Sequence, residues 1–235
     1  MNTKHFTVYA LWLTALLAPV PAQAQINTLT REEMIRYTSQ SPYERFPDGR
    51  PKVPDSVLNQ MKDMSAEEFI GAGGRGPGQF VDGFQLLHPG KKLIGRAFTL
   101  QLMPLRAEVA DADAAAWKEK GHDRPLNHQT AIDMLQPGDV FVVDAGGGVD
   151  AGGIVGDNLA YYIWKKTGAG FVIDGAIRDL EGIAPFDMAG YFRAAIPPAI
   201  RNVMVTGINV PVRIGKTTVL PGDVVFGDRE GVAFV

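Results

Sequence analysis

The sequence predicts a mixed α/β domain whose last strands close into an antiparallel or barrel-like sheet. From Leu93 onward, short runs rich in β-branched and aromatic residues are separated by turns, which is typical of strands. Strands first alternate with helical segments, and the stretch from Tyr191 to Val235 is then almost entirely strand. The chain has 235 residues, 46% hydrophobic and 21% charged, which is an ordinary composition for a soluble domain.

Residues 1–24 are predicted to be a secretory signal that is cleaved after Ala24. Lys4 precedes an almost wholly apolar stretch over residues 6–20, and Ala22-Gln23-Ala24 supplies the small-x-small pattern of a cleavage site. A membrane anchor is the alternative, but the apolar run is short for a span of about 20 residues. We therefore expect a periplasmic or secreted protein that does not contact the membrane after cleavage.

Residues 25–70 are predicted to form an N-terminal helical extension. Thr30 precedes an Arg-Glu-Glu-Met run, and Ser65 opens a Ser-x-x-Glu sequence with the spacing of a capping box. Residues 41–54 contain four prolines, which predicts an exposed connection between the helices. Residues 71–78 are so rich in glycine that we expect a loop there, at the start of a catalytic domain that comprises residues 71–235.

Apolar runs and turn signals then predict the elements of the domain in order. Strands are expected at residues 93–103, 140–144, 171–174, 191–196, 203–206, 210–214, 217–220, 223–226 and 231–235, and helices at residues 127–135 and 157–167. Pro-Gly-Asp occurs at residues 137–139 and 221–223, each time directly before a strand, and we interpret both copies as turns without a chemical role.

Charge and residue usage exclude several classes of protein. The chain carries 23 Lys and Arg against 26 Asp and Glu, a net charge of −3, so no overall positive field would attract nucleic acid. Cys is absent, which excludes disulfides, thiolate zinc sites and a cysteine nucleophile. The histidines show no metal-ligand spacing, and we expect Trp117, Trp164 and the Tyr161-Tyr162 pair in the core or in an interface.

A glycine-rich segment before the helix at residues 157–167 predicts an anion site. The buried-looking strand at residues 140–144 runs into Ala-Gly-Gly-Gly, and Gly156, Asp157 and Asn158 open the helix. Unpaired backbone N–H groups and the positive end of the helix dipole at such a start suit a carboxylate or phosphate. The simpler alternative is that Asp157 or Asn158 only caps the helix.

Arg178 and Asp179 follow the strand at residues 171–174 and the turn after it. If this strand lies beside the strand at residues 140–144, both residues reach the sheet edge where the helix begins, an edge at which α/β proteins commonly bind ligands. Arginine can clamp a carboxylate with two hydrogen bonds, and aspartate can hold a hard cation. The alternative is an exposed Arg-Asp turn with a weak surface ion pair.

A further interpretation of this region starts from its glycines. The Asp-Ala-Gly-Gly-Gly sequence from Asp144 partly matches a nucleotide or S-adenosylmethionine site, with Asp174 available to bind a ribose. A run of βαβ units that would complete a doubly wound sheet is missing from the pattern, so we rank a methyltransferase low.

Several segments together resemble the RraA-like family, which includes 4-hydroxy-4-methyl-2-oxoglutarate aldolases and regulators of ribonuclease E activity. The matching sequences are Gly-Asp-Val-Phe-Val-Val-Asp from Gly138, Gly-Asp-Asn-Leu from Gly156, Val-Ile-Asp-Gly-Ala-Ile-Arg-Asp from Val172, Asn-Val-Pro-Val from Asn209, and Pro-Gly-Asp-Val-Val-Phe-Gly-Asp from Pro221. The resemblance runs from about Gly73 to the C-terminus. It implies a swivelling β/β/α domain and a homotrimer or a hexamer with active sites near the subunit interfaces.

The resemblance also implies roles for individual residues. In family aldolases the helix start binds the pyruvyl part of the substrate, which carries over to Gly156, Asp157, Asn158 and Leu159. Arg178 would clamp the substrate, Asp179 would hold a divalent metal, most simply Mg²⁺ or else Mn²⁺, and Arg178 and Asp157 would be catalytic. The ribonuclease regulators lose the Gly-Asp pair and the metal aspartate, and both are intact here.

The sequence therefore predicts a metal-dependent, class II type aldolase that releases pyruvate from a small 2-oxo acid such as 4-hydroxy-4-methyl-2-oxoglutarate. An oxaloacetate-type decarboxylase, or another lyase or isomerase that forms an enolate from an exported substrate, is the enzymatic alternative. A periplasmic binding or regulatory module is the alternative outside enzymes. Asn158 stands where aldolases often have an apolar residue, and an export signal is unusual for a catabolic aldolase.

Overall fold

The computed structural model describes residues 28–73 and 79–235. The predicted signal peptide and residues 74–78 of the glycine-rich segment lie outside these ranges. Within them, no helix combines the length and the apolar character needed to cross a membrane. The described chain is a mixed α/β structure, which confirms the predicted fold class.

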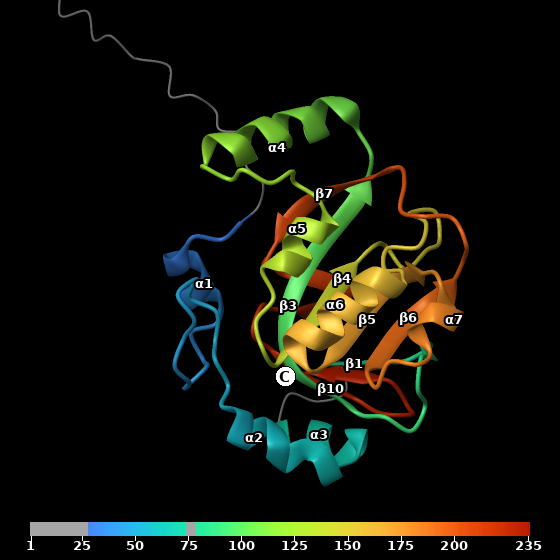
Figure 1. The fold of residues 1–235 in the computed structure, drawn as a ribbon. Coiled ribbons are helices and arrows are strands. Elements are labelled where there is room, and N and C mark those ends of the chain that lie inside the picture. Colours follow the sequence, from blue (N-terminus) through green and yellow to red (C-terminus); the bar gives the residue numbers. More distant parts are fainter. Residues whose placement is uncertain (1–27, 74–78) are drawn as a thin grey trace, which may run out of the picture.

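A nine-stranded sheet forms the centre of the described chain (Figure 1). Four neighbouring strands are parallel: β3 (Leu93–Pro104), β4 (Asp139–Asp144), β5 (Gly170–Ile177) and β6 (Ala189–Ala195). Antiparallel strands extend the sheet on both sides: β10 (Val224–Gly227), β11 (Val232–Phe234) and β1 (Phe80–Val81) beyond β3, β7 (Val203–Ile208) also against β3, and β2 (Gln85–Leu86) against β6. The strands β8 (Val212–Ile214) and β9 (Thr217–Val219) form a separate hairpin.

Helices cover one face of the sheet and one of its ends. The helices are α1 (Arg31–Tyr37), α2 (Asp55–Gln60), α3 (Ala66–Gly73), α4 (Ala107–Glu119), α5 (His128–Asp133), α6 (Asp157–Thr167) and α7 (Leu180–Ile183), with a 3₁₀ turn at Met61–Asp63. In Figure 1, α5 and α6 lie across β3, β4 and β5, whereas α2 and α3 lie below the sheet near β10. Apolar side chains fill the space between the sheet and these two groups of helices, α5 with α6 and α2 with α3. A further apolar cluster lies between the sheet and the hairpin of β8 and β9.

The central strands form where the sequence has continuous apolar runs. All six residues of β4 and all eight residues of β5 are buried, because the sheet is covered on both faces. The helix α6 ends where Gly168 adopts the left-handed conformation with φ of 70° and donates its N–H to Trp164 O. The strands and helices predicted from Leu93 onward are thus confirmed, with ends that shift by a few residues.

Both Pro-Gly-Asp sequences form the same turn. Gly138 and Gly222 have φ of 81° and 89°, which a glycine adopts without steric cost. Asp139 Oδ2 accepts a hydrogen bond from Gln136 N, and Asp223 Oδ2 accepts one from Leu220 N, each at 2.8 Å. The two aspartates therefore close turns that begin a strand, as predicted.

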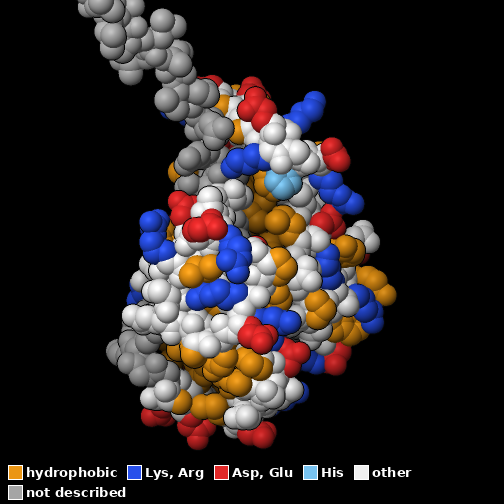
Figure 2. All heavy atoms as spheres, turned by 90° about the vertical axis from the view of Figure 1, so that its left-hand side faces the viewer, with side chains coloured by type: hydrophobic (Ala, Val, Ile, Leu, Met, Phe, Trp, Pro, Cys, Tyr) orange, Lys and Arg blue, Asp and Glu red, His pale blue; other side chains and the backbone are white. Residues whose placement is uncertain are grey.

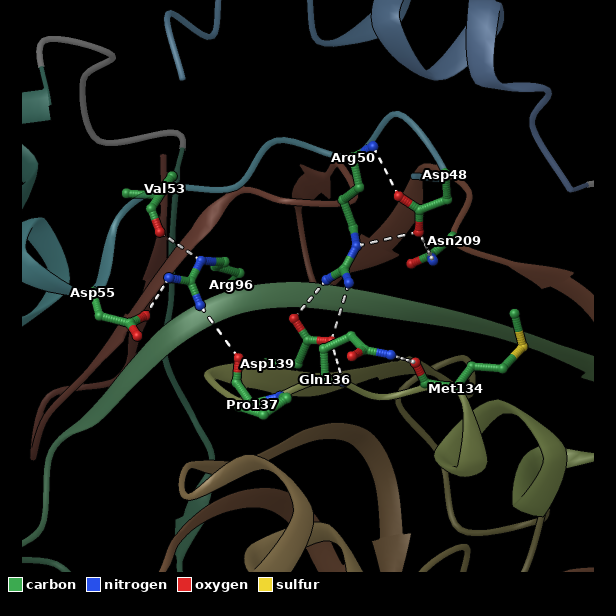
Figure 3. A network of polar contacts seen from close by, with 10 residues as sticks. All are labelled: Asp48, Arg50, Val53, Asp55, Arg96, Met134, Gln136, Pro137, Asp139 and Asn209. Atoms are coloured by element: carbon green, nitrogen blue, oxygen red, sulfur yellow. Dashed lines mark hydrogen bonds and ion pairs between the residues drawn. The ribbon is translucent and has the colours of Figure 1, made fainter. Parts of the chain in front are cut away.

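The segment at residues 41–54 is not the exposed connection that its prolines predict. Arg50 is 1% exposed, and its guanidinium donates to both carboxylate oxygens of Asp139, at 2.6 and 3.1 Å (Figure 3). Asp139 is fully buried, and desolvation raises the pKa of its carboxyl, while the charge of Arg50 opposes that rise. A buried two-pronged ion pair thus fixes the N-terminal extension to the start of β4.

Other expectations need correction as well. Gly71 and Gly73 belong to α3, because the helix that Ser65 and Glu68 cap with reciprocal hydrogen bonds continues into the glycine-rich segment. The sequence interpretation missed α4, whose alanine-rich surface shows little helical amphipathicity. Tyr161 and Tyr162 are 48% and 44% exposed, so they are not core residues and their alternative place in an interface stays a prediction, whereas Trp117 is buried as expected.

Candidate active site at the carboxyl edge of the parallel strands

Arg178 and Asp179 lie directly beyond the carboxyl end of β5, next to the N-terminus of α6. The segment before α6 runs alongside the end of β5: Ile154 N donates to Ala176 O at 2.9 Å, and Arg178 N donates to Val155 O at 3.0 Å. A parallel bridge between Gly153 and Ala176 continues this pairing. The helix start is therefore held against the Arg-Asp pair by backbone hydrogen bonds, as the sequence predicts.

Two glycines permit this close approach. A Cβ atom on Gly156 would lie 2.5 Å from Asp179 Oδ2, closer than real Cβ contacts, and 3.1 Å from Arg178 Nε, which is a tight contact. A Cβ atom on Gly153 would lie 2.7 Å from Arg178 Cβ. Gly156 is also the N-cap of α6. Its role in the described structure is to leave room for the carboxylate of Asp179.

Asp179 has an unusual backbone conformation. Its φ of 60° and ψ of 41° are in the left-handed region, which residues other than glycine adopt infrequently. Its carbonyl oxygen accepts hydrogen bonds from Gly182 N and Ile183 N at 3.0 and 3.1 Å, so α7 holds the conformation. Strain of this kind is found preferentially at functional sites, where it orients a side chain.

The Arg178 and Asp179 side chains lie next to each other and remain open to solvent. Arg178 Nε is 3.5 Å from Asp179 Oδ2, and the two side chains are 39% and 33% exposed. At this exposure the pair contributes little to stability, because water screens the two charges. The arrangement thus leaves a guanidinium and a carboxylate available to a ligand.

Asp157 is the first residue of α6 and lies against α7. A Cβ atom on Gly182 would lie 2.7 Å from Asp157 Cβ and 3.0 Å from its Oδ2, so this glycine gives Asp157 the space to pack. Asp157 Oδ1 accepts a hydrogen bond from Asn158 N at 2.7 Å. Asp157 stands at the positive end of the helix dipole, where a carboxylate is stabilised.

The remaining two residues of the predicted substrate motif have different surroundings. The side chain of Asn158 is exposed, whereas Leu159 is half-buried and packs on the core between α6 and the sheet. The structure therefore brings Gly156, Asp157, Arg178 and Asp179 together, with Asn158 at the rim. The side chain of Leu159 packs in the core, so only the backbone of this residue could face a ligand.

Two nearby aspartates are engaged in the scaffold. Asp174 Oδ1 accepts from Arg193 Nε at 2.6 Å, and its Oδ2 accepts from Gly215 N at 2.9 Å. Asp144 accepts from Gly146 N and Arg213 N at 3.0 and 3.2 Å. Because both oxygens of Asp174 are occupied by protein donors, the structure gives no support to the ribose-binding role considered for it.

The donor set at the site fits a hard divalent cation. In residues 28–73 and 79–235, His, Cys, Asp and Glu side chains form no group of three or more that could hold a metal ion. Mg²⁺ commonly binds one or two carboxylates and completes its coordination with water and substrate oxygens, whereas zinc sites need three or four protein ligands. Asp179 before α7 and Asp157 at the start of α6 supply the one or two carboxylates of the Mg²⁺ or Mn²⁺ pattern.

Sequence reasoning missed Gly153 and Gly182 as parts of this site. Both are needed because a neighbouring side chain, Arg178 or Asp157, occupies the space of their missing Cβ atoms. The available signal was the unusual density of glycine before α6 and the single glycine inside the short α7. Neither pattern says which side chain fills the space.

Comparison with known proteins identifies the class of protein that this fold and site define. A family profile described as Aldolase/RraA, RraA-like, matches residues 67–234. The chain therefore belongs to the RraA-like family. The crystal structure of RraAS2 from Streptomyces coelicolor, titled an unusual member of the RNase ES inhibitor RraA protein family, superimposes with a TM-score of 0.64 at 28% identity and covers 78% of this chain and 87% of that one.

Curated relatives carry an aldolase name. A protein of Shewanella oneidensis, provisionally named a 4-hydroxy-4-methyl-2-oxoglutarate aldolase, is 33% identical over 138 residues, which are 57% of this chain and 84% of that protein. A protein of Halalkalibacterium halodurans with the same provisional name is 35% identical over 106 residues, 45% of this chain and 50% of that protein. The chain thus spans about half the length of the latter relative.

Proposed function

We propose that this protein is a divalent-metal-dependent carbon–carbon lyase of the aldolase type. Its substrate would be a small 2-oxo acid such as 4-hydroxy-4-methyl-2-oxoglutarate, and pyruvate would be released. The observation that carries the proposal is the contact of Arg178 Nε with Asp179 Oδ2 at 3.5 Å, beside the N-terminus of α6. The aldolase names of the curated relatives support the same reaction class.

Arg178 binds and orients the substrate in this proposal. Its planar guanidinium can donate two parallel hydrogen bonds to the carboxylate next to the 2-oxo group. Its charge is also fixed near the position where the enolate oxygen forms when the carbon–carbon bond breaks. A preorganised donor of this kind contributes about 3 kcal/mol to stabilisation of the transition state.

Asp179 would hold the divalent ion, with Asp157 as the second carboxylate. When bound, Mg²⁺ or Mn²⁺ supplies Lewis-acid stabilisation of the charge that develops on the 2-oxo oxygen. The left-handed backbone of Asp179 and the missing side chain of Gly156 fix the direction of the carboxylate. Backbone N–H groups at the start of α6 favour negative charge on the substrate.

The proposal is tested by pyruvate release from 4-hydroxy-4-methyl-2-oxoglutarate, followed with lactate dehydrogenase, with and without EDTA. We expect EDTA and Asp179→Ala to abolish turnover, with recovery on added Mg²⁺ in the wild type only. Asp187→Ala is a matched control, because that side chain is 82% exposed in a surface pair with Lys91. Oxaloacetate as substrate separates the decarboxylase alternative, and inertness with every 2-oxo acid would favour a binding module.

We also propose that the protein is exported and assembles into a homotrimer or hexamer. Export rests on residues 1–24, and assembly on membership of the RraA-like family. N-terminal sequencing of the native protein should begin at Gln25, and light scattering should give three or six chains per particle. An intact Met1 would refute export, and a monomeric particle would refute the assembly.

A further inference from the structure

A cavity lies at the opposite end of the parallel strands from Arg178. It has a volume of about 580 Å³, is bounded by the N-terminal extension on one side and the start of β10 on the other, and is partly open to solvent. Val224 of β10 pairs with Arg96, and Arg96 pairs with Asp139 at the beginning of β4. The cavity shares no lining residue with the candidate active site.

Apolar side chains from the N-terminal extension and from the C-terminal strands and their flanking residues dominate the wall. They include Val53, Val57, Met61, Phe69, Val224 and Val235. Figure 2 looks onto the face that carries α1 and α2, and hydrophobic side chains gather in its lower part. A space of this size and character falls in the range of ligand sites, which hold about 300–1,000 Å³.

Polar contacts hold the walls apart. Arg45 donates to Thr38 Oγ1, Thr38 O and Gly49 O at 2.6 to 2.9 Å, which fixes the loop that forms the outer wall. The inner wall is fixed by the buried Arg50–Asp139 ion pair and by the hydrogen bond from Arg96 Nε to Val53 O at 2.6 Å (Figure 3).

These contacts explain why the space does not collapse. Protein interiors pack densely and contain few voids larger than a water molecule, because an apolar void forfeits dispersion contacts. Here charged groups fix both walls before any occupant arrives. A preformed apolar space lowers the ordering cost of binding, which is the arrangement of a ligand site.

The charge of the wall restricts the occupant. Among the described lining residues there is no Lys, Arg, His or Glu, and the acidic Asp223 uses Oδ2 to accept a hydrogen bond from Leu220 N. The other polar lining residues are uncharged: Tyr37, Thr38, Ser39, Gln40, Ser41 and Tyr43. An anionic ligand would lose its hydration without gaining an opposite charge from any described lining residue, and the one carboxylate there, that of Asp223, would repel it.

We propose that this cavity binds a neutral, mainly apolar small molecule, at a site separate from the lyase centre. Its body lies against the apolar side chains, and its polar group reaches the uncharged loop at residues 39–43. The inference does not depend on the proposed lyase reaction, because none of its residues takes part in that reaction.

Fluorescence titration with N-phenyl-1-naphthylamine, a neutral apolar dye, tests the site in the purified full-length protein. We expect saturable enhancement with one dye per chain. The anionic dye 8-anilino-1-naphthalenesulfonate should bind at least about tenfold more weakly, because its sulfonate would lose hydration without meeting a cation among the described lining residues. Equal or tighter binding of the anionic dye, or no saturable binding of the neutral one, overturns the proposal.

Variants locate the dye. Val57→Trp fills the cavity from α2, and we expect it to weaken binding of the neutral dye at least about tenfold. Ser56→Trp is the matched control, because Ser56 is next to Val57 on α2 but is exposed and does not line the cavity. Ala72→Trp fills the cavity from α3 and decides the matter if Val57→Trp fails to fold by circular dichroism. Unchanged affinity in the folded cavity-filling variants overturns the assignment, whereas Asp179→Ala should leave dye binding intact.

Discussion

Replacing Gly156 by alanine tests the geometry of the candidate active site with a single methyl group. The new Cβ atom would lie 2.5 Å from Asp179 Oδ2, whereas ordinary contacts begin at 3.4 Å. The backbone of Gly156, with φ of −106° and ψ of −174°, is accessible to alanine, so the substitution introduces no left-handed strain. The conflict therefore falls on the carboxylate and on Arg178 behind it.

The size of the conflict sets the expected effect. Asp179 Oδ2 has to retreat by about 0.9 Å to restore an ordinary contact. A displacement of about 1 Å in a positioned group costs on the order of a hundredfold in rate, which corresponds to about 2.7 kcal/mol. We expect kcat/KM for pyruvate release to fall by this factor, and affinity for Mn²⁺ to fall with it.

The assay compares Gly156→Ala with Gly148→Ala. Gly148 lies in the same glycine-rich segment, has no atom within 4 Å of the Cβ that alanine would add, and lacks a left-handed φ. The control should retain turnover and Mn²⁺ binding, measured by coupled absorbance and calorimetry. Wild-type kcat/KM in a folded Gly156→Ala variant would refute the role of the close approach between Gly156 and Asp179.

Three further predictions follow from the described contacts. Arg178→Lys keeps the positive charge but loses the planar guanidinium, so kcat should fall on the order of a hundredfold with a smaller rise in KM. A raised KM with unchanged kcat would mean that Arg178 only binds the substrate. Arg50→Met leaves the Asp139 carboxylate buried without its cation, so the free energy of unfolding measured in denaturant should fall by about 3–5 kcal/mol. The double variant Arg50→Met/Asp139→Leu should recover part of this stability, because it also removes the buried carboxylate. An unchanged denaturation midpoint in Arg50→Met contradicts this. Hydrogen bonds from the Ser65 backbone N–H and then from its hydroxyl lower the pKa of Glu68 from 4.5, so their stabilisation is present above pH 4.5 and is lost as the pH falls through the lowered pKa. Ser65→Ala keeps the backbone donor and removes the hydroxyl, so carboxyl NMR titration should show the pKa rising part of the way toward 4.5; an equal pKa in both proteins would refute the contribution of the hydroxyl.

The fold could be predicted from local patterns where one interaction dominates. The run from Val140 to Val143 is apolar at every position, which a strand buried on both faces requires. Each Pro-Gly-Asp sequence contains its turn in full, with proline and glycine for the backbone and aspartate for the closing hydrogen bond. Such elements depend on residues within one turn of each other and need no knowledge of distant partners.

Elements that depend on distant partners were predicted poorly. The helix α4 packs through few side chains, among them the buried Trp117, so its alanines show no strong apolar stripe. The prolines of residues 41–54 indicate an exposed loop, but Arg50 finds Asp139 across 89 positions of sequence. Burial of that arginine follows from the ion pair, and no local pattern marks its partner.

The candidate site shows the same division within a few residues. Arg178, Asp179 and the glycine before α6 could be selected from their chemistry and from the rule that parallel strands open on one edge. The left-handed conformation of Asp179 could not, because aspartate adopts this conformation only occasionally and no glycine stands at this position to indicate it. Gly156 shows why the geometry is harder to predict than the residue types. It has to lack a side chain because the Asp179 carboxylate, 23 positions later in the chain, occupies that space. The two residues meet only when the end of β5 is paired with residues 153–155. The residue types thus predict the chemistry of the site. The exact positions of its side chains depend on backbone pairing, which the sequence determines only through the whole fold.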